Sequence, residues 1–99
     1  MDLGLRGKVV LVTGSSRGIG LTEARLFAAE GARVAVNGVR ADRAEQAAAS
    51  IRAAGGEARA YAADVTKADE VAGLIDRVAA ALGPCAVLVN NAGRAGRHL

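Results

Sequence analysis

Four short apolar runs recur along the chain, and longer segments rich in alanine and charged residues separate them. The runs cover Lys8–Thr13, Arg33–Asn37, Ala58–Ala63 and Ala86–Asn90. An unbroken β-branched run such as KVVLVT is typical of a strand that is buried on both faces, as in a parallel sheet. The pattern therefore predicts four strands, of which the third, which contains Tyr61, is the weakest.

The segments between these runs have the spacing and the end signals of helices. Two of these helices, with the glycines expected to end them, are Ile19–Glu30 with Gly31 and Asp42–Ala54 with Gly55 and Gly56. Thr66 is expected to cap a third helix, with Asp69 completing a weaker form of the capping box, and Gly83-Pro84 ends that helix. Its apolar face, which is expected to pack on the sheet, consists of Val71, Leu74, Ile75, Val78 and Leu82.

Strands that alternate with helices through short connections predict a single α/β domain over residues 1–99. The expected fold is a Rossmann-type doubly wound parallel sheet, here the N-terminal portion of one, with the strand order 3-2-1-4. The fourth strand is interior in a complete sheet of this kind. Because no further strand follows it in this sequence, we expect its outer edge to be bare and the chain to be prone to self-association.

Composition restricts the core and the partners. Hydrophobic residues make up 52% of the chain but aromatic residues only 2%, so the core must be built from alanine, valine, leucine and isoleucine. No apolar run approaches the roughly 20 residues of a membrane span, and Met1–Lys8 lacks the apolar region of a signal peptide. A single cysteine excludes an internal disulfide and fits a cytoplasmic protein. The net charge of +3 comes from scattered residues, so nucleic acid is not an expected partner.

A glycine-rich turn between the first strand and the first helix is the strongest candidate for a binding site. It consists of Gly14, Ser15, Ser16, Arg17, Gly18, Ile19 and Gly20. A phosphate group needs backbone N–H donors that no side chain blocks, and a helix N-terminus supplies them. Gly14 would allow the tight turn, Gly18 the close approach of a pyrophosphate, and Gly20 the close packing of helix on sheet. The context predicts nucleotide binding, with a merely structural turn as the alternative.

Three motifs together resemble the short-chain dehydrogenase/reductase family, and their order and spacing match it as far as about Gly93. The motifs are Thr13-Gly14-x-x-x-Gly18-Ile19-Gly20, Asp64-Val65 and Asn90-Asn91-Ala92-Gly93. The resemblance implies that a nicotinamide dinucleotide binds, with the Asp64 side chain on the adenine amino group and the Val65 backbone against the ring. It also implies that Asn91, Ala92 and Gly93 lie beneath the adenine ribose and the nicotinamide. The alternatives are a strand-end or helix-capping acid at Asp64 and a structural turn at Asn90-Asn91.

Cofactor choice follows from the residues after the second strand. Sites that prefer NAD usually place an acid there to hold the ribose hydroxyls. Here the stretch reads Asn37-Gly38-Val39-Arg40, and no acid occurs before Asp42. Either Arg17 or Arg40 can hold a 2′-phosphate, although a solvated loop charge is the alternative for Arg40. We therefore expect NADP(H) to be preferred over NAD(H), with Val39 and Arg40 as part of the cofactor site.

The catalytic residues that the resemblance implies are missing from these 99 residues. The family uses a Tyr-x-x-x-Lys pair and an upstream serine, but Tyr61 is the only tyrosine and Val65 stands four residues after it. We also find no metal cluster, and Cys85 and His98 are isolated. We expect the chain to end where the substrate site would begin and to be inactive alone. The parent reaction would be NADP(H)-linked reduction of a ketone, as in the 3-oxoacyl carrier-protein reductases, in a family that is usually homo-oligomeric. The alternatives are a non-catalytic nucleotide-binding module or a non-functional truncated fragment.

Overall fold

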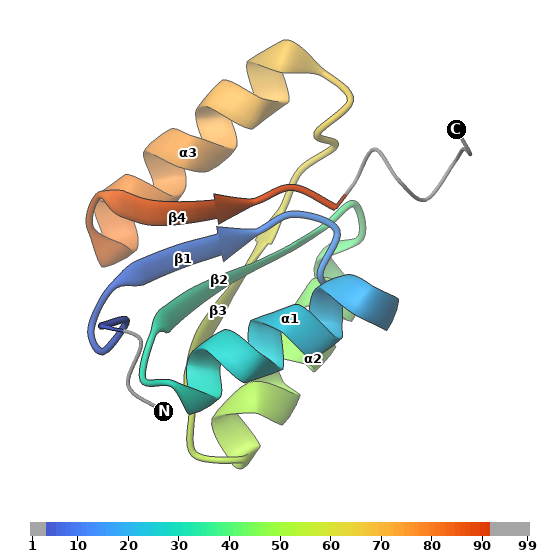
Figure 1. The fold of residues 1–99 in the computed structure, drawn as a ribbon. Coiled ribbons are helices and arrows are strands. Elements are labelled where there is room, and N and C mark those ends of the chain that lie inside the picture. Colours follow the sequence, from blue (N-terminus) through green and yellow to red (C-terminus); the bar gives the residue numbers. More distant parts are fainter. Residues whose placement is uncertain (1–3, 92–99) are drawn as a thin grey trace.

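The computed structural model describes residues 4–91, and every predicted strand and helix is present in this range. In chain order the elements are β1 (Val9–Val12), α1 (Gly18–Ala29), β2 (Arg33–Gly38), α2 (Ala41–Ala53), β3 (Glu57–Ala62), α3 (Ala68–Leu82) and β4 (Cys85–Val89). The four strands form a parallel sheet in the order β3-β2-β1-β4, which confirms the predicted fold class (Figure 1).

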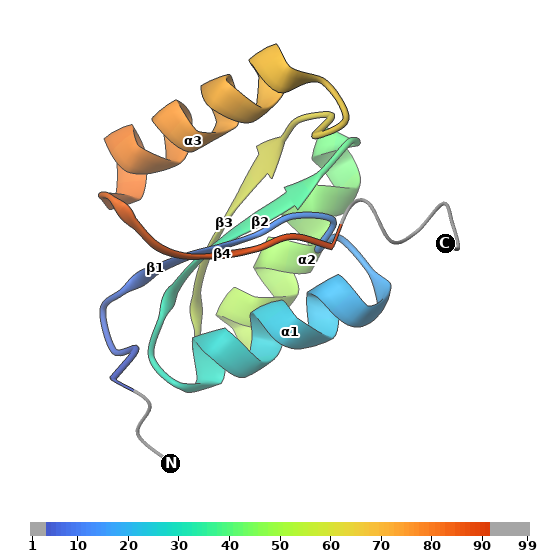
Figure 2. The same ribbon diagram turned by 45° about the horizontal axis from the view of Figure 1, so that its top comes forward.

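The helices cover the sheet on both faces. α1 and α2 lie on one face and α3 lies on the other, as the two ribbon views agree (Figures 1 and 2). This arrangement follows from right-handed crossovers, because the connection from β3 to β4 runs across the sheet in the opposite direction to the first two. In the described part of the chain β4 pairs with β1 alone, so its other edge carries no strand.

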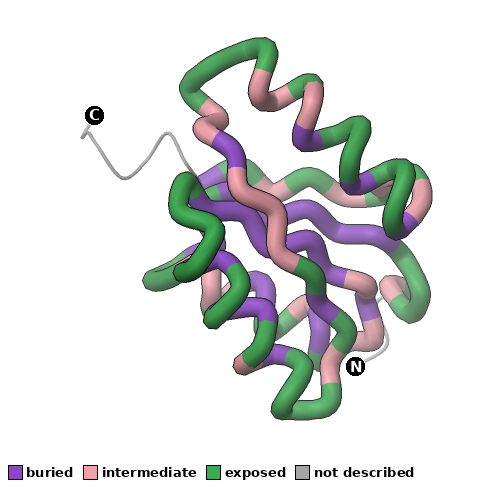
Figure 3. The backbone as a smooth tube through the Cα atoms, turned by 180° about the vertical axis from the view of Figure 1, so that it is seen from behind, coloured by how far each residue is buried: buried purple, intermediate pink, exposed green. Residues whose placement is uncertain are grey.

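The core consists of small aliphatic side chains, as the composition predicted. All four residues of β1 are buried, and β2 is buried from Val34 to Gly38. In Figure 3 the buried segments concentrate on these central strands, whereas the outward faces of the helices are exposed. β4 is only half-buried, and the Leu88 side chain is 54% exposed.

Two features of the helices differ from the sequence prediction. Thr66 does not cap α3: the cap residue is Lys67, it makes no side-chain capping hydrogen bond, and the Thr66 hydroxyl donates to Asp64 instead. The expected apolar face of α3 is buried at Leu74, Val78 and Leu82, but Ile75 is 39% exposed because it lies at the margin of the contact with the sheet. None of the helices within residues 4–91 has the length and apolar character needed to cross a membrane.

Candidate functional site

The turn between β1 and α1 is held in place by hydrogen bonds to Val12 of β1 and Asn37 of β2. Gly14 and Gly18 have φ angles of +60° and +63°, in the left-handed region that favours glycine. The Gly14 N–H donates to the Asn37 side-chain oxygen at 3.1 Å, and the buried Ser15 hydroxyl donates to the Val12 carbonyl at 2.6 Å. The first half of the glycine turn is therefore built into the sheet.

The second half of the turn leaves backbone donors without partners. The first intrahelical hydrogen bond of α1 runs from the Leu21 N–H to the Arg17 carbonyl, and the cap residue Arg17 makes no side-chain bond. The N–H groups of residues 18–20 thus have no acceptor among the described residues. A Cβ placed on Gly18 would meet nothing within 4 Å, so the space beside this residue is open. The first turn of α1 also contains no acidic residue, which makes this helix end suitable for an anion.

Gly20 allows the helix to pack closely, as predicted, but against the turn itself. A Cβ at this position would lie 2.2 Å from the Gly14 carbonyl oxygen and 2.9 Å from the Ser15 Cα. No side chain of any kind fits at that distance.

Asn37, which the sequence analysis did not assign to the site, organises the turn. Its side chain is 1% exposed. Its amide nitrogen donates to the carbonyls of Tyr61 at 3.1 Å and Ala63 at 3.3 Å, while its backbone N–H donates to the Ser15 hydroxyl at 2.9 Å. Together with the Gly14 bond, these contacts tie the turn to β2 and β3. A polar residue inside an otherwise apolar strand, beside a glycine turn, is the sequence signal that identifies it.

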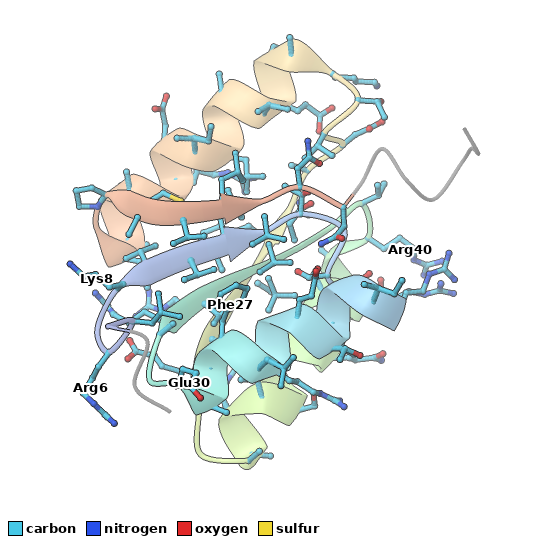
Figure 4. All side chains as sticks on the ribbon, in the orientation of Figure 1. Arg6, Lys8, Phe27, Glu30 and Arg40 are labelled. Carbon is cyan, nitrogen blue, oxygen red and sulfur yellow. The ribbon has the colours of Figure 1, made fainter. Side chains whose placement is uncertain are left out.

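A cleft of about 340 Å³ opens at the carboxyl ends of β1 and β2. Its lining residues are Gly14, Ser16, Arg17, Gly38, Val39, Arg40, Arg43 and Asn91. Of the predicted residues of the glycine turn, Gly14, Ser16 and Arg17 line the cleft, together with Val39, Arg40 and Asn91. The other four, Ser15, Gly18, Ile19 and Gly20, do not line it. The structure adds Arg43, which lies in the first turn of α2 and which the sequence analysis missed. In Figure 4, Arg40 projects on the side where α1 begins, whereas Arg6, Lys8 and Glu30 lie at the opposite end of the sheet.

The three arginines of the cleft are not equivalent. The Arg40 guanidinium binds Asp42 through Nε···Oδ1 at 3.2 Å and Nη2···Oδ2 at 3.1 Å. This hydrogen-bonded pairing lowers the pKa of Asp42 and raises the pKa of Arg40. Arg17 and Arg43 have no ion-pair partner within residues 4–91. Two unpaired cations and one paired cation therefore surround the cleft.

The end of β4 is fastened to β1 by Thr13. The Thr13 hydroxyl donates to the Asn90 side-chain oxygen at 3.0 Å and accepts from the Asn91 N–H at 3.0 Å. The Asn91 side-chain nitrogen donates to Glu23, while its buried side-chain oxygen has no partner among the described residues. These hydrogen bonds hold Asn90 and Asn91 against the end of β1, and the structural turn that the sequence offers as an alternative for them stays a prediction. Ala92 and Gly93, the remaining predicted site residues of this motif, lie outside the described residues.

Asp64 and Val65 do not line the cleft of about 340 Å³. The Asp64 carboxylate accepts from the Thr66 hydroxyl at 2.6 Å and from the Thr66 N–H at 3.0 Å, and these bonds lower its pKa. Val65 instead lines a separate apolar hollow of about 60 Å³ between α3 and the strands β1 and β4. The contacts of the two residues with adenine stay a prediction.

Tyr61 and Cys85 make structural contacts. The guanidinium carbon of Arg77 lies 5.8 Å from the centre of the Tyr61 ring, and the Cys85 thiol donates to the Val87 carbonyl at 3.0 Å. In the part of the chain that the structure describes, no three histidine, cysteine, aspartate or glutamate side chains gather to hold a metal ion. His98 lies outside the described residues.

Comparison with known proteins identifies a family. The family model described as short chain dehydrogenase matches residues 8–99. D-threitol dehydrogenase of Mycolicibacterium smegmatis is 44% identical over 92 residues, which are 93% of this chain and 35% of that protein. 7alpha-hydroxysteroid dehydrogenase of Escherichia coli is 40% identical over 95 residues, which are 96% of this chain and 37% of that protein. The chain spans about a third of the length of the curated relatives it matches.

Solved structures agree with the sequence comparisons. A metagenomic short-chain oxidoreductase in complex with NADP superimposes with a TM-score of 0.82 at 44% identity, and the match covers 88% of this chain and 39% of that one. A hydroxysteroid dehydrogenase from Escherichia coli gives a TM-score of 0.85 at 39% identity, over 88% of this chain and 37% of that one.

Proposed function

Since the chain belongs to the short chain dehydrogenase family, we propose that its cleft binds the pyrophosphate of a nicotinamide dinucleotide at the start of α1. The observation that carries the proposal is the set of N–H groups at residues 18–20, which have no acceptor among the described residues and start a helix whose first turn contains no acidic residue. The space beside Gly18 is open. Asn91 supports the proposal, because its buried side-chain oxygen has no partner within residues 4–91 and the residue lines the same cleft.

The same cleft supports a preference for NADP(H) over NAD(H). The ribose end of the cofactor would meet Arg17, Arg40 and Arg43, and none of the residues that line the cleft is acidic. Of the solved relatives, the metagenomic oxidoreductase was crystallised with NADP, which favours the same choice here. When bound, the cofactor supplies or accepts the hydride. The residues of this chain bind it and orient it.

For the whole protein we propose reversible oxidation of an alcohol or reduction of a ketone. The relatives are named as dehydrogenases of D-threitol and of a hydroxysteroid, so the family match leaves the substrate broad. A 3-oxoacyl thioester is our more specific proposal, and it depends on the motif resemblance alone. Residues 1–99 contain no Tyr-x-x-x-Lys pair, so we propose that the proton donor for the carbonyl oxygen lies outside them.

Binding at the glycine turn can be tested by NMR titration with NADP⁺. We expect the amide resonances of residues 18–20 to shift first, because their N–H groups would donate to the pyrophosphate. A second hollow of about 520 Å³ between α1 and α2, lined by Arg25 and Ser50 among others, serves as the internal comparison. Shifts confined to that hollow would contradict the proposed site.

The cofactor preference can be tested by substituting Arg17. Arg17→Ala should weaken NADP(H) binding by about 1.5–3 kcal/mol, the usual contribution of a hydrogen bond to a charged group, and weaken NAD(H) binding much less. Arg25→Ala removes the same charge from a residue of α1 outside the cleft and is the matched control. Equal losses for both cofactors would exclude a role of Arg17 at the 2′-phosphate.

A further inference from the structure

The ion pair between Arg40 and Asp42 lies at the edge of the proposed cofactor cleft. Arg40 directly precedes α2 and lines the cleft, whereas Asp42 is the second residue of the helix and does not line it. The pair uses the guanidinium edge formed by Nε and Nη2, with distances of 3.2 Å and 3.1 Å to the carboxylate. The guanidinium that faces the cleft is therefore already bound to an anion.

We propose that Asp42 is a positioning residue that, by holding Arg40 in this pair, weakens 2′-phosphate binding and so moderates the preference for NADP(H). The proposal rests on the proposed function of the cleft. It assigns to Asp42 a role in cofactor specificity although the residue itself lies outside the lining.

The chemistry of the pair supports competition between the two anions. A 2′-phosphate that approaches Arg40 must share a guanidinium whose positive charge a carboxylate already offsets, and the two anions repel each other. The hydrogen bond from Arg40 lowers the pKa of Asp42, so the carboxylate stays charged at neutral pH. NAD(H) carries an uncharged hydroxyl at the same place, so this competition does not affect it.

Two neighbouring arginines also attract a phosphate to the cleft. Arg17 and Arg43 line the same cleft and have no ion-pair partner within the described residues. They provide the greater part of the attraction for a phosphate, and release of Arg40 would add a third unpaired cation. Both members of the pair are about 60% exposed, with side-chain values of 61% and 59%, so solvent limits the gain to a few-fold.

The experiment compares the wild-type chain with Asp42→Asn, using two adenosine nucleotides that differ only by the 2′-phosphate. Adenosine 2′,5′-bisphosphate and 5′-AMP are titrated against each protein, and circular dichroism confirms that the helix content is unchanged. We expect Asp42→Asn to bind the bisphosphate about threefold to fivefold more tightly, within the range of exposed ion pairs. The affinity for 5′-AMP should change by less than about twofold, because that nucleotide does not use Arg40.

Two further variants separate the pair from a general effect of charge. Asp69→Asn removes a carboxylate from the equivalent second position of α3 and should leave both affinities unchanged. In an Arg40→Ala background, Asp42→Asn should no longer tighten the binding of the bisphosphate, because Asp42 acts through Arg40.

Each remaining outcome contradicts the inference in a distinguishable way. An equal gain in the Arg40→Ala background would show that the charge of Asp42 acts without the pair, and weaker bisphosphate binding in Asp42→Asn would show that Asp42 assists the phosphate. If neither nucleotide binds to the wild type or the variant, the proposed function of the cleft fails together with this inference.

Discussion

The turn from β1 to α1 and the turn from β3 to α3 both follow the carboxyl end of a parallel strand and both start a helix. In the turn between β3 and α3, side chains form hydrogen bonds with the polar groups. The Asp64 carboxylate accepts two hydrogen bonds from Thr66, and the Asp64 N–H donates to the Glu70 side chain at 2.8 Å. In the turn between β1 and α1, Asn37 accepts a hydrogen bond from the Gly14 N–H, whereas the N–H groups of residues 18–20 have no acceptor in the part of the chain that the structure describes.

This difference shows that topology alone does not make an anion site. Neither helix has a side-chain cap, but the Glu70 N–H of α3 donates to the Lys67 carbonyl at 3.1 Å, whereas the first such bond of α1 comes from Leu21. The first turn of α3 carries Asp69 and Glu70, whereas the first turn of α1 carries no acid. A carboxylate at a helix N-terminus interacts favourably with the helix dipole, and it repels a ligand phosphate. Local sequence therefore decides which of the two helix ends suits the nucleotide that we propose.

The largest effect on stability is expected at the closest contact in the turn between β1 and α1. Gly20→Ala places a Cβ 2.2 Å from the Gly14 carbonyl oxygen, so helix and turn must separate. We expect the free energy of unfolding to fall by about 3 kcal/mol, as measured by urea denaturation. Gly73→Ala in α3 is the matched control, because its Cβ meets nothing within 4 Å and should stabilise the chain by about 0.5–1 kcal/mol. Equal effects of the two substitutions would contradict the close contact.

The next largest effect on stability is expected at Asn37 of β2, which holds the turn between β1 and α1. Asn37→Ala removes the acceptor of the Gly14 N–H and the donor to the Tyr61 and Ala63 carbonyls, all in a buried environment. We expect the unfolding free energy to fall by about 2 kcal/mol, the cost of buried polar groups left without partners. Asn90→Ala, which removes an exposed amide bonded to Thr13, is the control and should cost less. A stable Asn37→Ala variant with unchanged amide shifts at Gly14 would contradict the organising role.

The sequence predicted the fold because its signals are local and repeat in the right order. The alternation of apolar runs and helical segments determines a parallel sheet, and Gly31 and Gly55, with φ angles of +90° and +94°, end α1 and α2 where expected. The glycine turn could be located for the same reason, since its residues are consecutive. The match of residues 8–99 to the short chain dehydrogenase family agrees with the motif resemblance.

Contacts between distant residues could not be predicted in the same way. Thr66 has the right residue type for a helix cap, but its hydroxyl donates to the carboxylate of Asp64, two residues earlier, and does not cap α3. Arg40 was expected to be available for a phosphate, yet it is paired with Asp42, and the role of Arg43 depends on how α2 lies against the glycine turn. Such choices depend on side-chain geometry that no spacing pattern contains.

In a third prediction, a substitution makes the start of α1 resemble the start of α3. Ile19→Glu places an acid at the second position of α1, which corresponds to Asp69 in α3, and Ile19 is 68% exposed, so the fold should tolerate it. The helix should gain about 0.3–1 kcal/mol of stability through its dipole. NADP⁺ binding should weaken by about tenfold, since the carboxylate repels the pyrophosphate. Ile19→Gln is the neutral control. Parallel changes in stability and binding would contradict this account.

The smallest effect concerns pH and is confined to the second turn. The Thr66 hydroxyl, with the Thr66 N–H, lowers the pKa of Asp64 below its ordinary value of about 3.9. A carboxyl group whose pKa is lowered in the folded state contributes stability above its ordinary pKa, and this contribution is lost as the pH falls through the lowered value. Thr66→Val removes the hydroxyl and keeps the side-chain shape, so the pKa of Asp64 should rise towards its ordinary value.

NMR titration of the Asp64 carboxyl carbon measures this change directly, and urea denaturation at pH 7 and pH 3 measures its effect on stability. Thr66→Val should destabilise the chain more at pH 7 than at pH 3, because protonation of Asp64 in the unfolded chain reduces this contribution as the pH falls. Thr22→Val is the control, because the Thr22 hydroxyl donates to the Gly18 carbonyl at 3.3 Å in α1 and contacts no carboxylate. Its cost should therefore be the same at both pH values. If both variants lost the same stability at both pH values, the turn between β3 and α3 would have no more charge coupling than the turn between β1 and α1.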